Sequence, residues 1–229
     1  MGNRPIKIAI DGPAASGKST TARELARRLG YLYIDSGAMY RAVTLKALKQ
    51  GIPTTDAAEM ARLAQTCRIE FRPDSRKTMV LLDGEDVSEA IRSPEVNGHI
   101  NPVAANPRVR EILVKKQQEL GRQGGVVMDG RDIGTVVFPD AELKIYMEAS
   151  AEERARRRWR ELRSKGIEID FQQVYQEILT RDKSDCTRDH GPLRKAPDAI
   201  VLDTTHLTIP EQVEKIYRLA LRKIREQDP

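Results

Sequence analysis

The chain has 229 residues, of which 32% are charged and 39% hydrophobic, a composition typical of a single globular domain. Its net charge of +5 is modest because 34 acidic residues offset 39 basic ones, which favours anionic small molecules over specific nucleic acid. Its two cysteines, Cys67 and Cys186, are far apart and in no metal-like spacing, so we expect reduced cysteines that serve packing. No apolar run approaches membrane length, and a strand pattern starts almost at once, so we expect a cytoplasmic protein without signal peptide or membrane contact.

The first predicted elements are a buried strand, a glycine-rich loop and a helix, in that order. Residues 6–11 form an apolar run, and residues 12–19 read Gly-Pro-Ala-Ala-Ser-Gly-Lys-Ser, which matches G-x-x-x-x-G-K-[ST]. A helical stripe follows at Ala22, Leu25, Ala26 and Leu29, and Gly30 ends it. This context indicates a phosphate-binding loop, in which Lys18 would reach the β- and γ-phosphates of ATP and Ser19 would ligate Mg²⁺.

Four further apolar runs alternate with helical patterns along the rest of the chain, at residues 32–34, 126–128, 143–147 and 199–202. With the first strand they predict a five-stranded parallel sheet covered by helices on both faces, a three-layer α/β sandwich. The last helix has a capping box formed by Thr208 and Glu211.

One segment, from about residue 63 to residue 98, interrupts this alternation. Its strand patterns at residues 68–71, 78–82 and 85–87 include an Asp83-Gly84 turn, which is typical of a β-hairpin. We interpret it as a small antiparallel subdomain inserted into the α/β domain. The alternative is a hairpin at the edge of the main sheet.

Charged residues follow the ends of two predicted strands, where open α/β sheets bind their ligands. Asp129 ends the third strand, in the position of a carboxylate that holds Mg²⁺ through water, although such a residue can also simply cap the next turn. Arg41 follows the second strand and Arg131 the third. Arg110 lies in the first turn of a helix that Asn106-Pro107 would start.

A second group of arginines lies on helical patterns. The helix predicted over 150–166, with a capping box at Ser150 and Glu153, contains Arg154, Arg156, Arg157, Arg158, Arg160 and Arg163. After a phosphate-binding core such a helix can be a lid over a triphosphate, or else a solvated face or a nucleic-acid contact. Further along, Arg181, Asp185 and Arg188 share a helical face, a spacing that ordinary surface ion pairs also produce.

Taken in order, five blocks resemble the bacterial cytidylate kinase family: residues 12–20, 35–41, 83–87, 129–135 and 181–185. The resemblance covers essentially the whole chain. It implies a monomeric P-loop kinase, a single domain over 1–229 with a monophosphate-binding extension at 63–98 and a lid at 150–166. The implied reaction transfers the γ-phosphoryl group of ATP to CMP or dCMP with Mg²⁺.

The resemblance also implies roles for individual residues. ATP would be bound by Gly12, Pro13, Ala14, Ala15, Ser16, Gly17, Lys18, Ser19 and Thr20, with Arg157 and Arg158 from the lid. The acceptor phosphate would be clamped by Arg41, Arg131 and Arg188, and the sugar contacted and oriented by Ser36, Arg181 and Asp185. Cytosine would be read by Arg110 and Asp132. Asn101 stands at the base-binding edge, where a serine is common in the family.

Other functions remain open on the sequence alone. Another small-molecule P-loop kinase, of the shikimate or gluconate type, would share the phosphate loop. An RNA-binding P-loop ATPase could use the basic helix, but aromatic residues make up only 4% of the chain, few for stacking bases. A third alternative is an ATP-driven switch that hydrolyses ATP without an acceptor.

Overall fold

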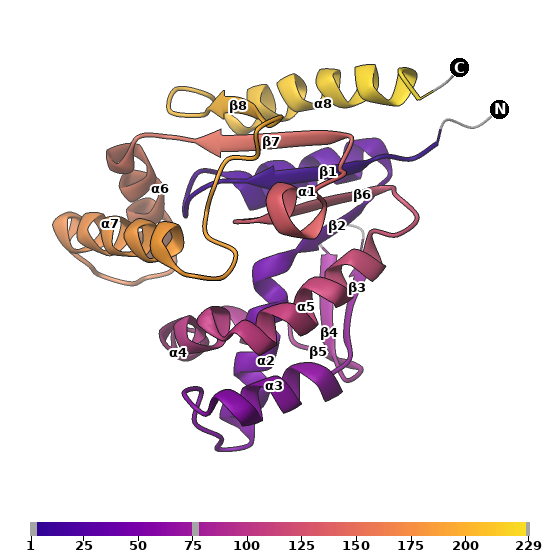
Figure 1. The fold of residues 1–229 in the computed structure, drawn as a ribbon. Helices are drawn as coiled ribbons and strands as arrows, with labels where there is room; N and C mark the ends of the chain where they lie inside the picture. The colour runs from indigo at the N-terminus through magenta and orange to yellow at the C-terminus, as the bar shows by residue number, and fades with distance from the viewer. Residues whose placement is uncertain (1–3, 75–77, 228–229) are drawn as a thin grey trace.

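The computed structural model describes residues 4–74 and 78–227. At its centre lies a parallel sheet with the strand order β2-β6-β1-β7-β8 (Figure 1). The strands are β2 (Leu32–Asp35), β6 (Val126–Gly130), β1 (Lys7–Asp11), β7 (Leu143–Glu148) and β8 (Ile200–Asp203). All five predicted strands are confirmed. After β1 the chain forms β2 at one edge of the sheet, and β6 later fills the position between them. The next strands, β7 and β8, are added on the other side of β1. The direction in which strands are added therefore reverses beside β1, and sheets of this type bind ligands at such a point.

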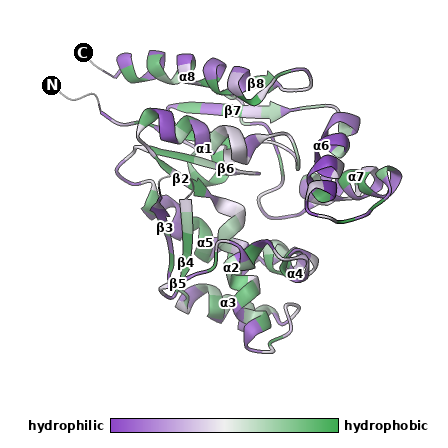
Figure 2. Ribbon diagram, turned by 180° about the vertical axis from the view of Figure 1, so that it is seen from behind, coloured by the Kyte–Doolittle hydropathy of each residue, from purple (hydrophilic) through white to green (hydrophobic). Residues whose placement is uncertain are grey.

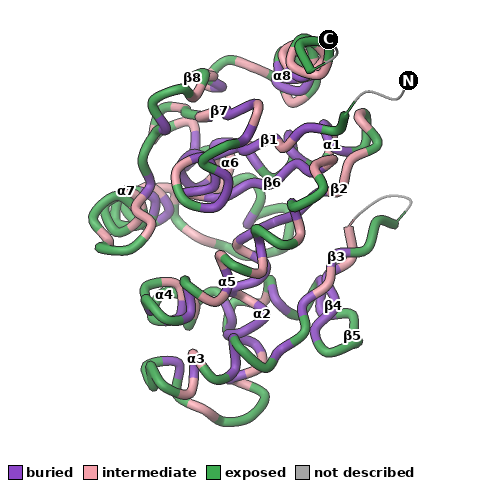
Figure 3. The backbone as a smooth tube through the Cα atoms, turned by 45° about the vertical axis from the view of Figure 1, so that its right-hand side comes forward, coloured by how far each residue is buried: buried purple, intermediate pink, exposed green. Residues whose placement is uncertain are grey.

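Side chains on successive residues of the sheet enter two different hydrophobic layers. Ile8 and Ile10 of β1 pack on the layer formed with α1 (Lys18–Leu29) and α8 (Ile209–Arg225). Ala9 enters the opposite layer, formed with α2 (Ser36–Lys49) and α5 (Pro107–Leu120). Figure 3 shows β1 and β6 buried and β8 more exposed, as expected for central and edge strands. The three-layer α/β sandwich is therefore confirmed.

The ends of two helices form as their sequences predict. Gly30 follows α1 with a φ of 69°, a left-handed conformation that glycine adopts without steric cost. At the start of α8, the Glu211 carboxylate accepts a hydrogen bond from the backbone N–H of Thr208 at 2.8 Å. Among the described residues, no helix has the length and apolar character needed to cross a membrane.

The segment between β2 and β6 contains a separate antiparallel sheet of order β3-β4-β5. The strands of this sheet are β3 (Ile69–Pro73), β4 (Thr78–Leu82) and β5 (Glu85–Asp86). The helix α3 (Ala57–Thr66) precedes them, and the short helix η1 (Ala90–Arg92) and α4 (Pro94–Ala105) follow; we call these elements together the inserted segment. The predicted turn forms at Asp83 and Gly84, both with positive φ. A hairpin on the edge of the main sheet is therefore excluded.

This small sheet shares its hydrophobic core with one face of the main sheet. Phe71 and Val80 belong to the same buried cluster as Ile34 of β2 and Met39 of α2. Deleting the segment would therefore remove part of the main core, so single substitutions test its function more cleanly.

Two helices, α6 (Ala151–Ser164) and α7 (Phe171–Thr187), pack against each other at one end of the main sheet (Figure 1). They have their own apolar cluster, in which Ala155 and Val174 are fully buried beside Ala14 of the phosphate loop. Figure 2 shows that α6 is mainly hydrophilic, in keeping with its many arginines.

The capping box predicted for α6 is only half formed. The Ser150 hydroxyl accepts from the backbone N–H of Glu153 at 3.2 Å. The second bond is absent because the Ser150 N–H donates to the Thr205 hydroxyl at 3.1 Å, and the Glu153 carboxylate accepts from Arg157 Nε at 3.1 Å.

Candidate active site

The phosphate loop lies between β1 and α1, and its glycines allow a close backbone approach. Gly12 has a φ of 151°, and a Cβ added there would lie only 2.0 Å from the carbonyl oxygen of Met147. Gly17 has a φ of 93° and directly precedes α1. Gly17 occupies the N-cap position of α1 and has no side chain to accept a hydrogen bond there. The first backbone N–H groups of α1 therefore stay available for an anion.

Lys18 curls back over this loop. Its Nζ donates to the carbonyl oxygen of Pro13 at 2.6 Å, and the side chain is buried. Burial and the nearby Arg131 lower the pKa of Lys18 to about 7, while Asp129 acts in the opposite direction. An anionic phosphate at the loop would therefore stabilise the charged form.

Asp129, at the end of β6, connects three elements of the site. One carboxylate oxygen accepts from Ser19 Oγ at 2.8 Å and the other from the Tyr33 hydroxyl at 2.8 Å. Burial, followed by the neighbouring Asp35, raises the pKa of Asp129. The backbone carbonyl of Asp129 accepts from Ser36 Oγ at 2.7 Å, so the predicted sugar-site serine also lies here.

These oxygen donors fit Mg²⁺. No group of three or more His, Cys, Asp or Glu side chains in the described ranges could hold a metal ion. Mg²⁺ commonly keeps several waters and binds through one or two carboxylates plus substrate phosphates, so it does not require such a cage. Ser19 and Asp129 are the residues that would hold it here.

Asp35, at the end of β2, holds two arginines through the same carboxylate oxygen. Arg41 Nη2 lies 2.9 Å from Oδ2, and Arg92 Nη2 lies 3.0 Å from it. Burial opposes ionisation of Asp35, but the two arginines outweigh burial and lower its pKa. The Nε of Arg41 is buried and has no hydrogen-bond partner, which leaves a donor ready for an acceptor atom of a ligand.

Asp185, near the end of α7, gathers the other predicted clamp arginines. Arg131 Nε donates to it at 2.6 Å, and Arg188 Nη1 lies 3.8 Å from its second oxygen. The Arg188 Nε also donates to the Gly191 carbonyl at 2.5 Å. The Arg181 side chain is exposed and makes no hydrogen bond or ion pair with a described residue, although Asp185 lies close enough to attract its charge. Asp185 and Arg188 thus lie at the strand ends rather than on a solvated helix face.

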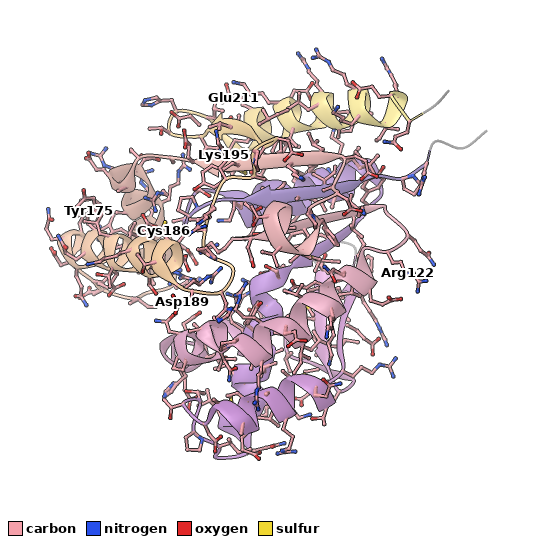
Figure 4. The ribbon with its side chains drawn as sticks, in the orientation of Figure 1. Arg122, Tyr175, Cys186, Asp189, Lys195 and Glu211 are labelled. Carbon is pink, nitrogen blue, oxygen red and sulfur yellow. The ribbon has the colours of Figure 1, made fainter. Side chains whose placement is uncertain are left out.

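The two predicted cytosine readers form a buried ion pair. Arg110 Nη2 donates to Asp132, Arg110 Nη1 donates to the Ala104 carbonyl at 3.2 Å, and the Arg110 guanidinium lies 5.4 Å from the centre of the Tyr40 ring. A Cβ added at Gly191 would lie 2.1 Å from Asp132, so backbone beyond α7 covers this pair. Figure 4 shows this segment leaving α7 at Cys186 and passing Asp189 on its way to Lys195 and β8.

Asp11, which the sequence did not single out, holds the loop that carries Arg131 and Asp132. Its carboxylate accepts from the backbone N–H groups of Ile133 at 2.8 Å and Gly134 at 2.7 Å. These begin a single-turn π-helix, η2 (Ile133–Val137). Burial raises the pKa of Asp11 to about 6, although the two N–H groups lower it.

Arginines of α6 reach the phosphate loop in different ways. Arg154 makes two hydrogen bonds to Asp182 of α7, at 3.0 and 2.6 Å, and one to the Ala14 carbonyl at 3.3 Å. Arg157 donates to the Thr204 carbonyl at 2.5 Å and to the Ser16 carbonyl at 3.4 Å.

The two predicted lid arginines therefore have different surroundings. Arg158 lies on the surface and pairs with Glu161 at 2.8 Å, whereas Arg157 joins α6 to the phosphate loop. Asn101 lies on an exposed turn of α4, and its side chain makes no hydrogen bond with any described residue.

Three residues of the site escaped the sequence analysis: Asp11, Tyr33 and Arg92. Arg154 was expected on the basic helix, but its bonds to Asp182 and Ala14 were not. The sequence does contain a pattern that could have identified Asp11 as a site residue: like Asp35, it is an acidic residue that ends a buried strand. Tyr33 and Arg92 have no such signal, because their partners lie 96 and 57 residues away along the chain.

Comparisons with known proteins identify relatives of this chain. A sequence profile of a family described as cytidylate kinase matches residues 8–222. The chain is 50% identical over 224 residues to a cytidylate kinase of Caldicellulosiruptor bescii, across 98% of this chain and 99% of that protein. It is also 50% identical over 223 residues to a cytidylate kinase of Bacillus velezensis, across 97% of this chain and 100% of that protein.

The low pKa of Lys18 predicts proton uptake when ATP binds. With a pKa of about 7, Lys18 is mostly neutral at pH 8, and the ATP phosphates should restore its charge by taking up about one proton. Towards pH 6 the uptake should fall, because Lys18 is already charged. Calorimetry in buffers of different ionisation enthalpy measures this uptake, with Lys18→Met as control. Equal uptake at pH 8 by the two proteins would contradict the assignment.

Proposed function

The chain belongs to the cytidylate kinase family, and we propose that the residues described above transfer the γ-phosphoryl group of ATP to CMP or dCMP. The products are ADP and CDP or dCDP. The observation that carries the acceptor assignment is the buried Nε of Arg41, a donor without a partner. It belongs to a group of arginines held by carboxylates at the strand ends, beside the phosphate loop, as the phosphate of a nucleoside monophosphate requires.

The donor would bind along the phosphate loop. Backbone N–H groups of the loop and the start of α1 face the anion, and Lys18 would lie against the transferring group. Mg²⁺, held by Ser19 and Asp129, would neutralise charge on the phosphates.

The acceptor phosphate would be clamped by Arg41, Arg131 and Arg188. In this proposal each guanidinium donates to phosphate oxygens, aligns the attacking oxygen with the γ-phosphorus and offsets the charge that the transition state spreads over the equatorial oxygens. Because the acceptor is itself a phosphate with a second pKa of about 6, it needs no general base near neutral pH.

Base recognition would rest on Asp132 and Arg110. An ionised Asp132 accepts a hydrogen bond from the exocyclic amine of cytosine and repels the carbonyl that uracil has in its place. Arg110 would donate to ring acceptors of cytosine. Ser36, Arg181 and Asp185 would contact and orient the sugar, while Asn101, which is exposed here, would take part only after the inserted segment moves.

We propose that α6 acts as a lid that moves together with α7. Their shared apolar cluster and the two hydrogen bonds from Arg154 to Asp182 join the two helices. Arg157 is bonded to backbone carbonyls that border the ATP site, and ATP would give it a charged partner instead. Arg158 would reach the nucleotide only if it left Glu161.

The proposed reaction can be tested by ATP turnover with a panel of acceptors. CMP and dCMP should be phosphorylated much faster than UMP, AMP, GMP or shikimate. Lys18→Met should lower turnover about 100-fold or more, the size expected for a lost transition-state contact, while its circular dichroism spectrum stays unchanged. Rapid turnover with shikimate would favour the other type of small-molecule kinase. ATP hydrolysis that ignores the acceptor would favour a switch or an RNA-dependent ATPase.

The base-reading role of Asp132 predicts a change of specificity. Asp132→Asn can turn its amide to donate to the uracil carbonyl, so the ratio of kcat/KM for CMP to that for UMP should fall. One hydrogen bond to a charged group is worth roughly 1.5–3 kcal/mol, about a ten- to hundredfold change in this ratio.

The ion pair with Arg110 offers a purely structural alternative for Asp132. If Asp132 only positions Arg110, the substitution should slow both substrates by similar factors and leave the ratio within about twofold. Asp140→Asn is a suitable control, because Asp140 is an exposed carboxylate paired with Lys7 at 2.5 Å.

A further inference from the structure

Arg92 closes the short helix η1, which connects the small antiparallel sheet to α4. Its guanidinium reaches across to the end of β2, where Nη2 donates to Asp35 Oδ2 at 3.0 Å. Asp35 is almost fully buried, whereas the Arg92 side chain is 49% exposed. The guanidinium is therefore anchored to Asp35 through one N–H, while about half of the Arg92 side chain stays exposed.

The position of this guanidinium relates it to the proposed acceptor site. Arg92 shares one carboxylate oxygen with Arg41, whose buried Nε lacks a partner. Partial burial opposes the charged form of Arg92, but Asp35, Tyr33 and Asp129 outweigh it and raise its pKa. Arg92 thus lies beside Arg41, on the same oxygen of Asp35.

We propose that Arg92 is a further acceptor-phosphate residue, supplied by the inserted segment. A guanidinium has five N–H donors, and one of those on Arg92 bonds to Asp35, so other donors are available for phosphate oxygens. The contact to Asp35 sets the position of Arg92 next to Arg41. Occupancy of the phosphate site would then draw the inserted segment towards the main sheet. This inference rests on the proposed function.

Comparing the affinities for CMP and cytidine isolates the phosphate. Both ligands share the base and the sugar, so their affinity ratio reports the phosphate contacts. In Arg92→Gln this ratio should fall by about ten- to hundredfold, the range of one charged hydrogen bond, while the affinity for cytidine stays within about twofold. Arg92→Lys should lose less, because it keeps the charge but not the planar fork of donors.

Arg72→Gln provides the matched control. Arg72 lies in β3 of the same inserted segment, is 59% exposed and pairs with Glu70 at 3.0 Å, so its loss should leave the ratio unchanged. A double-mutant cycle separates direct contact from an effect through Arg41. If Arg92 contacts phosphate itself, Arg92→Gln will weaken CMP binding further in an Arg41→Gln background; no further loss there would contradict the proposal.

The outcomes also separate this inference from the proposed function. A wild-type protein that does not phosphorylate CMP, or that binds cytidine as tightly as CMP, would contradict the function itself. A wild-type protein that strongly prefers CMP, with the same preference in Arg92→Gln, would overturn the role of Arg92 alone. If Arg92→Gln is poorly folded by thermal unfolding, Arg92→Lys decides, and an unchanged affinity ratio in that variant would likewise reject the proposal.

Discussion

The site depends on placing several guanidinium groups close together at one edge of a sheet. Like charges repel one another more strongly where they are partly buried, so a neighbouring carboxylate is needed to stabilise each of these arginines and hold it in position. Asp35 holds Arg41, Asp185 holds Arg131, and Asp132 holds Arg110. Because each carboxylate uses only some donors of its partner, the remaining N–H groups can bind phosphate.

The main sheet supplies several of these carboxylates. Asp11 and Asp35 end β1 and β2, Asp129 is the next-to-last residue of β6, and parallel strands bring their carboxyl ends to one edge. The phosphate loop starts at the same edge. Elements outside the sheet bring the remaining groups, since Arg92 comes from the inserted segment and Asp185 from α7. The proposed donor and acceptor sites are thus joined through carboxylates that each connect two parts of the fold.

Local sequence was sufficient for the sheet, the phosphate loop and the Asp83-Gly84 turn, because each depends on periodicity or on one steric requirement. It also indicated Arg110 at the start of α5 from Asn106 and Pro107. The partners of the arginines were not predictable in this way. Tyr33 reaches Asp129 only because β2 and β6 are neighbours. The capping box of α6 is only half formed, because Thr205 and Arg157 take the partners of its second bond. Such contacts are decided by tertiary packing, and no pattern within one element reports them.

The most direct test of the account is a crystal structure of the protein with CMP and a non-hydrolysable ATP analogue. We expect the CMP phosphate to accept hydrogen bonds from Arg41 Nε, Arg131 and Arg188, while Asp35 keeps its bond to Arg41 and Asp132 contacts the cytosine amine. A CMP phosphate bound away from these arginines, with Arg41 Nε still lacking a partner, would contradict the account.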